Sequence, residues 1–226
     1  MTQQRYHGNL GSFSRDELAE IAKKSVCVVG CGGLGGYVCN ALARFGVGSV
    51  TVVDGDDFSE SNLNRQFFAR ADTLGKNKAA VCAQELLKIN VAVPVVPVPE
   101  FLSQQNAAQI LKGHDLVIEC LDSAEVKIML EDKCEELGLS FVHGAINGFF
   151  GHVAVVLPGD RLMKKLYAAP EAQESPDGGS PVFTAQAVSA IQCSEAFKLL
   201  AGRPSCMRSK LLHINLEDNE FSLLDV

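Results

Sequence analysis

The 226-residue sequence has no run of basic residues, and its acidic side chains outnumber its basic ones. Its formal net charge is −7, so a nucleic-acid-binding surface is not expected. It also has no apolar stretch close to the roughly 20 residues that a membrane-spanning helix needs. The polar N-terminus does not resemble a signal peptide. We therefore expect a cytoplasmic protein with no nucleic-acid or membrane partner.

Cysteine pairs spaced as C-x-x-C are missing as well, although the sequence contains eight cysteines. Such pairs are the usual ligands of structural zinc, so no structural zinc is expected. Several of the cysteines lie within apolar stretches, where a free thiol packs as a small hydrophobic side chain. We therefore predict buried free thiols.

Repeats and low-complexity tracts are absent too, and 47% of the residues are hydrophobic. A chain of this length and composition can bury one sizeable core. We expect a single α/β domain over residues 1–226. Its mostly parallel, Rossmann-like sheet would be flanked by helices and followed by antiparallel strands near the C-terminus.

The strongest pattern lies between Val26 and Asp54. An apolar run leads into Gly30, Gly32 and Gly35, which have the spacing G-x-G-x-x-G, and a second apolar run ends at Asp54. This order predicts a strand, a tight turn, a helix and a second strand. The free N–H groups at the start of such a helix attract a phosphate, and Asp54 can accept hydrogen bonds from a ribose. The pattern predicts a nucleotide-binding site. NAD(P)-dependent enzymes are the proteins in which this pattern occurs most often.

Two cations favour ATP over NAD. Arg65 and Lys78 follow Asp54, close to the glycine turn expected at the same end of the sheet. An arginine and a lysine there would neutralise the charge that grows on the β and γ phosphates as pyrophosphate leaves. We interpret the neighbouring Lys76 as a solvated surface charge.

Four motifs, in this order and spacing, resemble the ThiF/MoeB/HesA family, the bacterial relatives of the ubiquitin-activating E1 adenylation domain. They are Gly-Cys-Gly-Gly-Leu-Gly at 30–35, Arg-Phe-Gly-Val-Gly at 44–48, Ser-Asn-Leu-Asn-Arg-Gln at 61–66 and Gly-Lys-Asn-Lys-Ala at 75–79. The resemblance runs from about Arg15 to Gly202. It implies an ATP- and magnesium-dependent adenylyltransferase, usually a homodimer. Its typical acceptor is the C-terminal Gly-Gly of a small ubiquitin-fold sulfur-carrier protein. A carrier of a thiamin, molybdopterin or cysteine pathway, and a peptide or small-molecule carboxylate, all remain open as the acceptor.

The resemblance also implies roles for individual residues. Asp54 would hold the ribose, Asp56 would contact the ribose or order the loop, and Asp122 would hold magnesium. Arg65, Lys78 and Asp122 would be the catalytic residues. The nucleotide would be lined by Gly30, Gly32, Gly33 and Gly35, and its phosphates would be met by Asn62, Arg65, Gln66 and Lys78.

The sequence departs from the family at two further points. Where many members have an N-terminal arginine that reaches the partner subunit's ATP site, this chain has Gly8, and Arg5 is the candidate replacement. The predicted mobile crossing loop, about residues 160–181, contains no cysteine. Neither Cys193 nor Cys206 is expected to handle sulfur, so we expect a separate sulfur donor protein.

Two alternatives remain open. A non-catalytic E1-like scaffold is favoured by the missing arginine and cysteine and opposed by the intact Arg65, Lys78 and Asp122. An NAD(P) oxidoreductase is supported by the glycine spacing alone.

The remaining pattern predicts further elements. Ser14 and Glu17 have the spacing of a capping box, Ser103 is placed as a helix cap, and His143 is interpreted as a structural histidine. Helices are predicted at 15–22, 76–90, 103–111, 123–137 and 182–202. Strands are predicted at 91–99 (an edge strand), 115–121, 140–143, 148–157 (half-exposed), 210–216 and 220–224.

Overall fold

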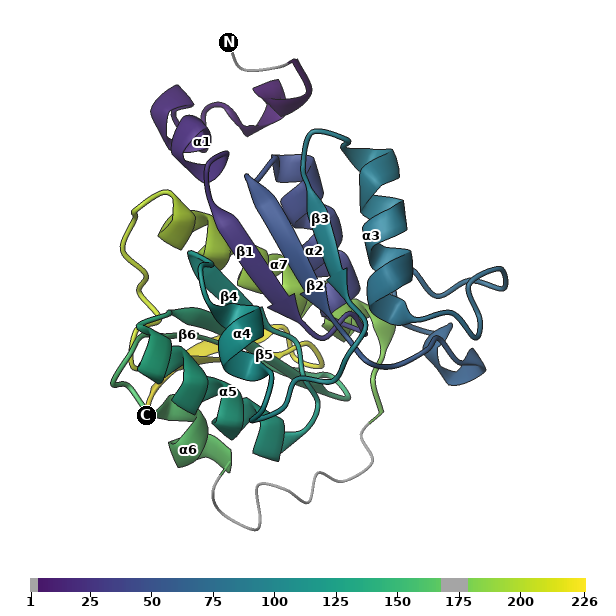
Figure 1. Cartoon of the computed structure of the whole chain (residues 1–226). Helices are drawn as coiled ribbons and strands as arrows, with labels where there is room; N and C mark the ends of the chain where they lie inside the picture. Colours follow the sequence, from purple (N-terminus) through teal and green to yellow (C-terminus); the bar gives the residue numbers. More distant parts are fainter. Residues whose placement is uncertain (1–3, 168–178) are drawn as a thin grey trace.

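The computed structural model describes residues 4–167 and 179–226, and these build one sheet with helices on both faces (Figure 1). Within them the strand order is β3-β2-β1-β4-β5-β6-β7-β8. Neighbouring strands from β3 to β5 are parallel, and β6, β7 and β8 continue the sheet as antiparallel strands. The predicted fold class is confirmed.

The strands are β1 (Ser25–Val29), β2 (Ser49–Val53), β3 (Val95–Val98), β4 (Leu116–Glu119), β5 (Phe141–Asn147), β6 (Phe150–Val156), β7 (Lys210–Asn215) and β8 (Glu220–Asp225). The helices are α1 (Arg15–Ile21), α2 (Gly35–Phe45), α3 (Lys78–Ile89), α4 (Ala107–Leu111), α5 (Ala124–Leu137), α6 (Leu162–Tyr167) and α7 (Val182–Leu200). Short 3-10 turns are η1 (Gln4–Asn9) and η2 (Glu60–Asn62). None of the helices described here is long and apolar enough to cross a bilayer.

The core consists of two apolar layers, one on each face of the sheet. Helices α2, α3 and α7 cover one face, where Val28 and Val52 point, while α4, α5 and α6 cover the face that carries Cys27 and Val117 (Figure 1). A parallel strand covered on both faces has no polar side, which is why β1 and β4 appear in the sequence as continuous apolar runs.

The predicted edge strand is confirmed, although it is shorter than expected. β3 pairs only with β2 and lies at the end of the sheet. Pro97, opposite Val52, has no N–H to donate, which an edge position tolerates.

Side-chain caps fix the ends of several helices. The predicted capping box of α1 is confirmed, because Glu17 N donates to Ser14 Oγ over 3.2 Å and Ser14 N donates to Glu17 Oε2 over 2.7 Å. The predicted cap at Ser103 is wrong. Ser103 N instead donates to Asn106 Oδ1 over 2.8 Å, and α4 begins only after Asn106.

Two predictions about the C-terminal half also need correction. β6 is not half-exposed, since its residues from Val153 onward are buried between the helices on the two faces. The segment 160–181 is not loose throughout, because it contains α6. Glu131 accepts backbone hydrogen bonds from Met163 (2.8 Å) and Lys164 (3.0 Å) and so anchors that helix. The rest of the predicted crossing loop, 168–178, lies outside the described residues.

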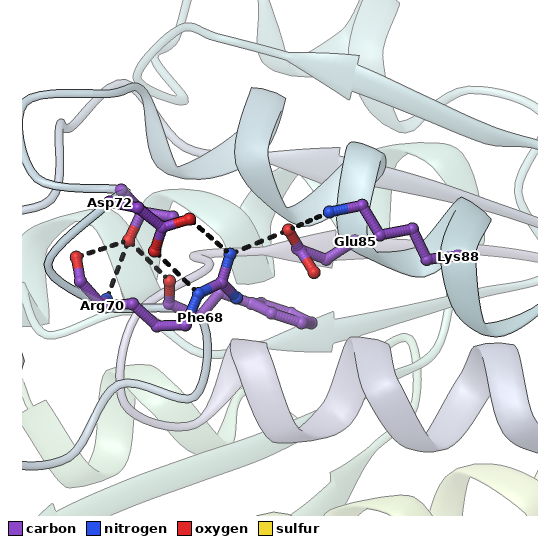
Figure 2. A network of polar contacts seen from close by, with 6 residues as sticks. Phe68, Arg70, Asp72, Glu85 and Lys88 are labelled. Carbon is purple, nitrogen blue, oxygen red and sulfur yellow. Dashed lines mark hydrogen bonds and ion pairs between the residues drawn. The ribbon is translucent and has the colours of Figure 1, made fainter.

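The loop after β2 is tied to α3 by a chain of charged contacts (Figure 2). Arg70 Nε donates to Asp72 over 3.0 Å, and Arg70 Nη2 donates to Glu85 of α3 over 2.9 Å. Lys88 Nζ also donates to Glu85, over 2.8 Å. Exposed pairs of this kind contribute little stability singly. Here they link the loop that carries Arg65 to the helix that begins at Lys78.

Candidate active site

A cavity of about 910 Å³ lies where the parallel strands β1 and β4 end, next to the turns that follow them. At this point the chain order of the strands reverses, with β2 and β3 on one side and β5 on the other, which is where open α/β sheets bind ligands. The structure brings most of the predicted site residues together here. Those that line the cavity are Gly30, Gly32, Gly33, Asp54, Asp56, Arg65, Gln66, Lys78 and Asp122.

The glycines of the turn divide into two kinds. Gly30 and Gly35 are required by packing: a Cβ at Gly30 would lie 2.4 Å from Cys120 O, and one at Gly35 would lie 1.8 Å from Gly30 O. Gly30 also has a φ of 96°, which a side chain disfavours. Gly35 does not line the cavity. The glycines that leave room for a ligand are Gly32 and Gly33, where a Cβ would meet only side chains.

The start of α2 suits an anion. Its N-cap residue, Leu34, makes no side-chain capping bond to the first turn. The N–H groups of a first turn have no acceptor within the helix, and the helix dipole adds positive potential there. Together with the open backbone at Gly32 and Gly33, this forms a cradle for phosphate oxygens.

Asp54 lies in the cavity wall with its carboxylate held in place by the backbone. Its two carboxylate oxygens accept hydrogen bonds from the backbone N–H groups of Cys31 (2.7 Å) and Asp56 (2.9 Å). Burial raises the pKa of Asp54 more than these hydrogen bonds lower it. Each oxygen keeps a second lone pair, so the side chain can still accept from a sugar hydroxyl.

Lys78 and Arg65 differ in their partners. Lys78, whose side chain is only 9% exposed, donates to Asp56 Oδ2 over 3.0 Å. Asp56 O also accepts from Lys78 N over 2.8 Å, which favours the loop-ordering role for this acid. Arg65 donates to Ser61 O (3.1 Å) and Asn64 Oδ1 (2.9 Å), and it makes no ion pair with any described carboxylate. Its charge is therefore available to an anion in the cavity.

Gln66 and Asn62 also differ in position. Gln66 is buried beside Gly32, and its Oε1 has no hydrogen-bond partner among the described residues. Such an atom needs a donor from a ligand or water. Asn62 does not line the cavity. Its Oδ1 accepts from Ser59 N over 3.0 Å and so closes the η2 turn before Arg65, and its contact with a phosphate stays a prediction.

The carboxylate of Asp122 is the kind of ligand that the predicted magnesium role requires. Its exposed carboxylate lines the cavity just beyond β4. The described residues contain no group of three or more His, Cys, Asp or Glu side chains that could hold a metal ion. Magnesium bound with a nucleotide needs only one or two carboxylates, since phosphates and water complete its shell. Asp122 is the side chain that would hold it.

Beside the cavity lies a buried polar network that was not predicted from the sequence, and two of its members, Lys127 and Tyr167, line the cavity. Glu119 accepts from Lys127 Nζ over 2.6 Å and is bonded to His143 Nδ1 over 2.5 Å, and Tyr167 Oη lies 3.2 Å from His143 Nε2. Burial opposes ionisation of Glu119, but the charges of Lys127 and His143 hold its pKa below the usual value. His143 is structural, as predicted. A signal was present: a charged residue interrupts each of the runs Leu-Val-Ile-Glu-Cys and Val-Lys-Ile-Met-Leu.

The far end of the cavity lies between β5 and β6. It is lined there by Ala145, Ile146, Phe150, Gly151 and His152. His152 Nε2 lies 3.0 Å from His213 Nδ1 on β7. Burial, with the charges of His143 and His213 as smaller causes, lowers the pKa of His152 to about 4, so the ring is neutral at pH 7.

This shift predicts a loss of stability in mild acid. The unfolded chain binds a proton at His152 below about pH 6.5 and the folded chain only below about pH 4, so stability falls as the pH drops between these values. The contribution lost between pH 7 and pH 5 is about 2 kcal/mol. Urea unfolding at the two pH values should show this loss in the wild type and a smaller one in His152→Gln. Equal losses in both proteins would contradict the assignment.

The cysteines match the prediction of free thiols. All eight are free, and of these only Cys206 is exposed. Burial raises the pKa of Cys193 to about 12, and it also raises that of Cys120, which lines the cavity, well above its usual value. A thiol with a raised pKa is a poor nucleophile.

Arg5, the candidate replacement for the N-terminal arginine, donates to Asn90 Oδ1 over 2.5 Å and does not line this cavity. Its reach into a partner subunit's ATP site therefore stays a prediction.

The glycine turn, Asp54, the two cations Arg65 and Lys78, and the strand-end acid Asp122 share one cavity, on a sheet that continues into antiparallel strands. This combination defines the E1-like class of nucleotide-binding enzymes. Residues 6–226 match the model of the ThiF family, so the chain belongs to the ThiF family.

Similar proteins carry several names. The chain is 34% identical over 200 residues to the SAMP-activating enzyme E1 of Haloferax volcanii, covering 87% of this chain and 74% of that protein. It is 33% identical over 236 residues to the sulfur carrier protein adenylyltransferase of Thermus thermophilus, covering 98% and 86%. It is 36% identical over 134 residues to the tRNA threonylcarbamoyladenosine dehydratase of Haemophilus influenzae, covering 59% of this chain and about half, 51%, of that protein.

Among solved structures, E. coli MccB with AMPCPP and MccA has a TM-score of 0.84 and covers 99% of this chain and 72% of that one, at 18% identity. That likeness shows the fold. The predicted family, the predicted fold and the predicted enzyme class, an E1-like adenylyltransferase, are confirmed.

Proposed function

We propose that this chain is an ATP- and magnesium-dependent adenylyltransferase that activates a carboxylate as an acyl-adenylate and releases pyrophosphate. The observation that carries the proposal is the meeting of Arg65 and Lys78 with the glycine cradle and Asp54 in one cavity. A dehydrogenase has no use for two cations beside its pyrophosphate cradle unless it binds an NADP phosphate.

The chemistry needs position and charge rather than a covalent intermediate on the protein. The acceptor carboxylate attacks the α-phosphorus, the bond from that phosphorus to the bridging oxygen of the β-phosphate breaks, and pyrophosphate leaves with the bonding electrons. Arg65 and Lys78 stabilise the charge that moves onto the leaving group, while Asp54 fixes the ribose. Bound magnesium, held by Asp122, would neutralise further phosphate charge.

We propose the C-terminal Gly-Gly of a small ubiquitin-fold sulfur-carrier protein as the acceptor. Two features support this substrate. The far end of the cavity is lined in part by small residues, among them Ala145 and Gly151, which suits a terminus without side chains. The net charge of −7 and the lack of a basic run disfavour a tRNA acceptor, although one relative is named for such a substrate.

A separate protein would then supply sulfur, and the enzyme would act as a homodimer. The raised pKa of Cys120 supports the first point, because the only described thiol that lines the cavity is a poor nucleophile. Exposed Phe67 and Phe149 near the site support the second. The neighbouring Phe68 is 3% exposed and belongs to the core, so it adds nothing to this surface.

The test is ATP–pyrophosphate exchange with Mg-ATP and a panel of ubiquitin-fold carriers ending in Gly-Gly. We expect exchange with at least one carrier and no exchange with the same carrier lacking its last two glycines. Mass spectrometry of that carrier should detect the AMP adduct. ATP binding without exchange for any carrier would support the scaffold alternative, and NAD binding without ATP binding would support the oxidoreductase. Exchange that occurs with tRNA and with no carrier would show that the acceptor is a tRNA and not a sulfur-carrier protein.

A further inference from the structure

A buried ion pair lies where β4 ends, directly before the loop that carries Asp122. Glu119, the last residue of β4, is 0% exposed, and Lys127 on α5 is 2% exposed and lines the wall of the cavity. Lys127 Nζ donates to Glu119 Oε1 over 2.6 Å and to Gly144 O of β5 over 3.2 Å. Apolar residues often replace such pairs without loss of stability, because removing two charges from water is costly. Stability alone therefore does not account for this pair.

The same carboxylate holds the backbone of the next loop. Glu119 Oε1 also accepts from Leu121 N over 2.6 Å, one residue before Asp122. Ser123, one residue after Asp122, is the N-cap of α5, and its Oγ accepts from Val126 N over 3.4 Å. The exposed Asp122 is thus held between two anchored neighbours.

The orientation of Glu119 depends on the groups around it. Lys127 and His143 bind its two oxygens, and Gln192 Nε2 on α7 donates to its backbone oxygen over 2.9 Å. A Cβ at Gly144 would lie 2.4 Å from the Gln192 side chain, so a glycine there permits this approach. Helices α5 and α7, from opposite faces of the sheet, therefore converge on one strand-end residue.

We propose that Lys127 is a positioning residue for the adenylation reaction. Acting through Glu119, it fixes the backbone at Leu121, and with it the direction in which Asp122 presents its carboxylate to nucleotide-bound magnesium. The proposal rests on the proposed function for the role of Asp122, but the placement of the loop can be measured without it.

The test compares two double variants. Glu119→Gln with Lys127→Met removes both charges, so that neither remains buried without a partner. Glu195→Gln with Lys198→Met is the control for removing a buried acid and its lysine away from the site: Glu195 of α7 is 2% exposed and paired with Lys198, whose side chain is 28% exposed. Neither residue lines the cavity, whereas Lys127 does, so the amide exchange of residues 121–123 is the readout that separates positioning from direct contact. Hydrogen exchange followed by mass spectrometry reports on the amides of residues 121–123. ATP–pyrophosphate exchange, titrated with magnesium, reports on the site.

We expect the first variant to stay folded, to exchange the amides of 121–123 at least fivefold faster than wild type and to need at least fivefold more magnesium for half-maximal activity. The control should change neither quantity. The single variant Lys127→Arg keeps a cation beside Glu119, so its half-maximal magnesium concentration should lie close to that of the wild type. Wild-type amide exchange in the folded first variant would overturn the proposal, as would faster exchange with an unchanged magnesium response. If the wild type shows no activity with any carrier, the proposed function fails, while amide exchange still decides whether Lys127 positions the loop.

Discussion

Replacing Lys78 with alanine is expected to lower the rate of acyl-adenylate formation by about 10²- to 10³-fold, the usual loss when one preorganised charge or donor is removed from a transition state. The buried ammonium lies in the wall of the cavity with Asp56 as its described partner. Its removal also leaves the Asp56 carboxylate beside the incoming triphosphate, which adds repulsion. Single-turnover formation of the carrier–AMP adduct, followed by mass spectrometry, measures the effect.

Lys76→Ala is the matched control. Lys76 is exposed, two residues away in the same segment, and outside the cavity lining, so its removal should change the rate by less than about twofold. Asp56→Asn, combined with Lys78→Ala, separates the lost cation from the uncovered acid: a partial recovery of the rate is expected. A Lys78→Ala enzyme as active as the Lys76→Ala enzyme would contradict the role of this lysine.

Replacing Gly35 with alanine is expected to cost about 3 kcal/mol or more of folding free energy, whereas replacing Gly33 should leave the fold intact. At Gly35 the new Cβ would lie 1.8 Å from the rigid carbonyl oxygen of Gly30, so the strand and helix must separate. At Gly33 the nearest atoms belong to the flexible Arg65 side chain, at 3.7 Å. There the methyl group occupies the cradle instead, and ATP affinity should fall at least tenfold.

Urea unfolding and calorimetric titration with Mg-ATP distinguish the two effects. Gly35→Ala should lose stability, and its loss of binding should follow from loss of the folded state. Gly33→Ala should unfold at wild-type urea concentrations and bind ATP poorly. If Gly35→Ala were as stable as wild type, our division between packing glycines and ligand-facing glycines would be wrong.

Local sequence patterns predicted the parts of this site that one stretch of chain builds by itself. The run from Val26 to Asp54 encodes strand, turn, helix and strand through apolar periodicity and glycine spacing, and the structure has them in that order. The cap of α1 needs only Ser14 and Glu17, three positions apart. The edge position of β3 follows from Pro97, which cannot donate a ladder hydrogen bond.

Predictions failed where a distant part of the chain decides the outcome. β6 was expected to be half-exposed because its sequence alternates, yet α5 and α6 cover one face and α7 the other. Helix α6 was missed because Glu131, more than thirty residues earlier, binds its first N–H groups. For Asn62 the structure adds a contact that the motif did not predict, the hydrogen bond from Ser59 N to its Oδ1 within the η2 turn, while its predicted phosphate contact stays a prediction.

The sequence by itself determined the nucleotide half of this protein, because glycine spacing, strand-ending acids and the family motifs act within short segments and keep their meaning in any fold that accommodates them. Only the tertiary structure decided which glycines face a ligand and which acid pairs with Lys78. It alone also placed Glu119 and Lys127 under the loop of Asp122. Those assignments depend on burial and on contacts between strands and helices far apart in the chain. Such contacts determine the free energy of burying a charge, which cannot be predicted from a short segment of sequence.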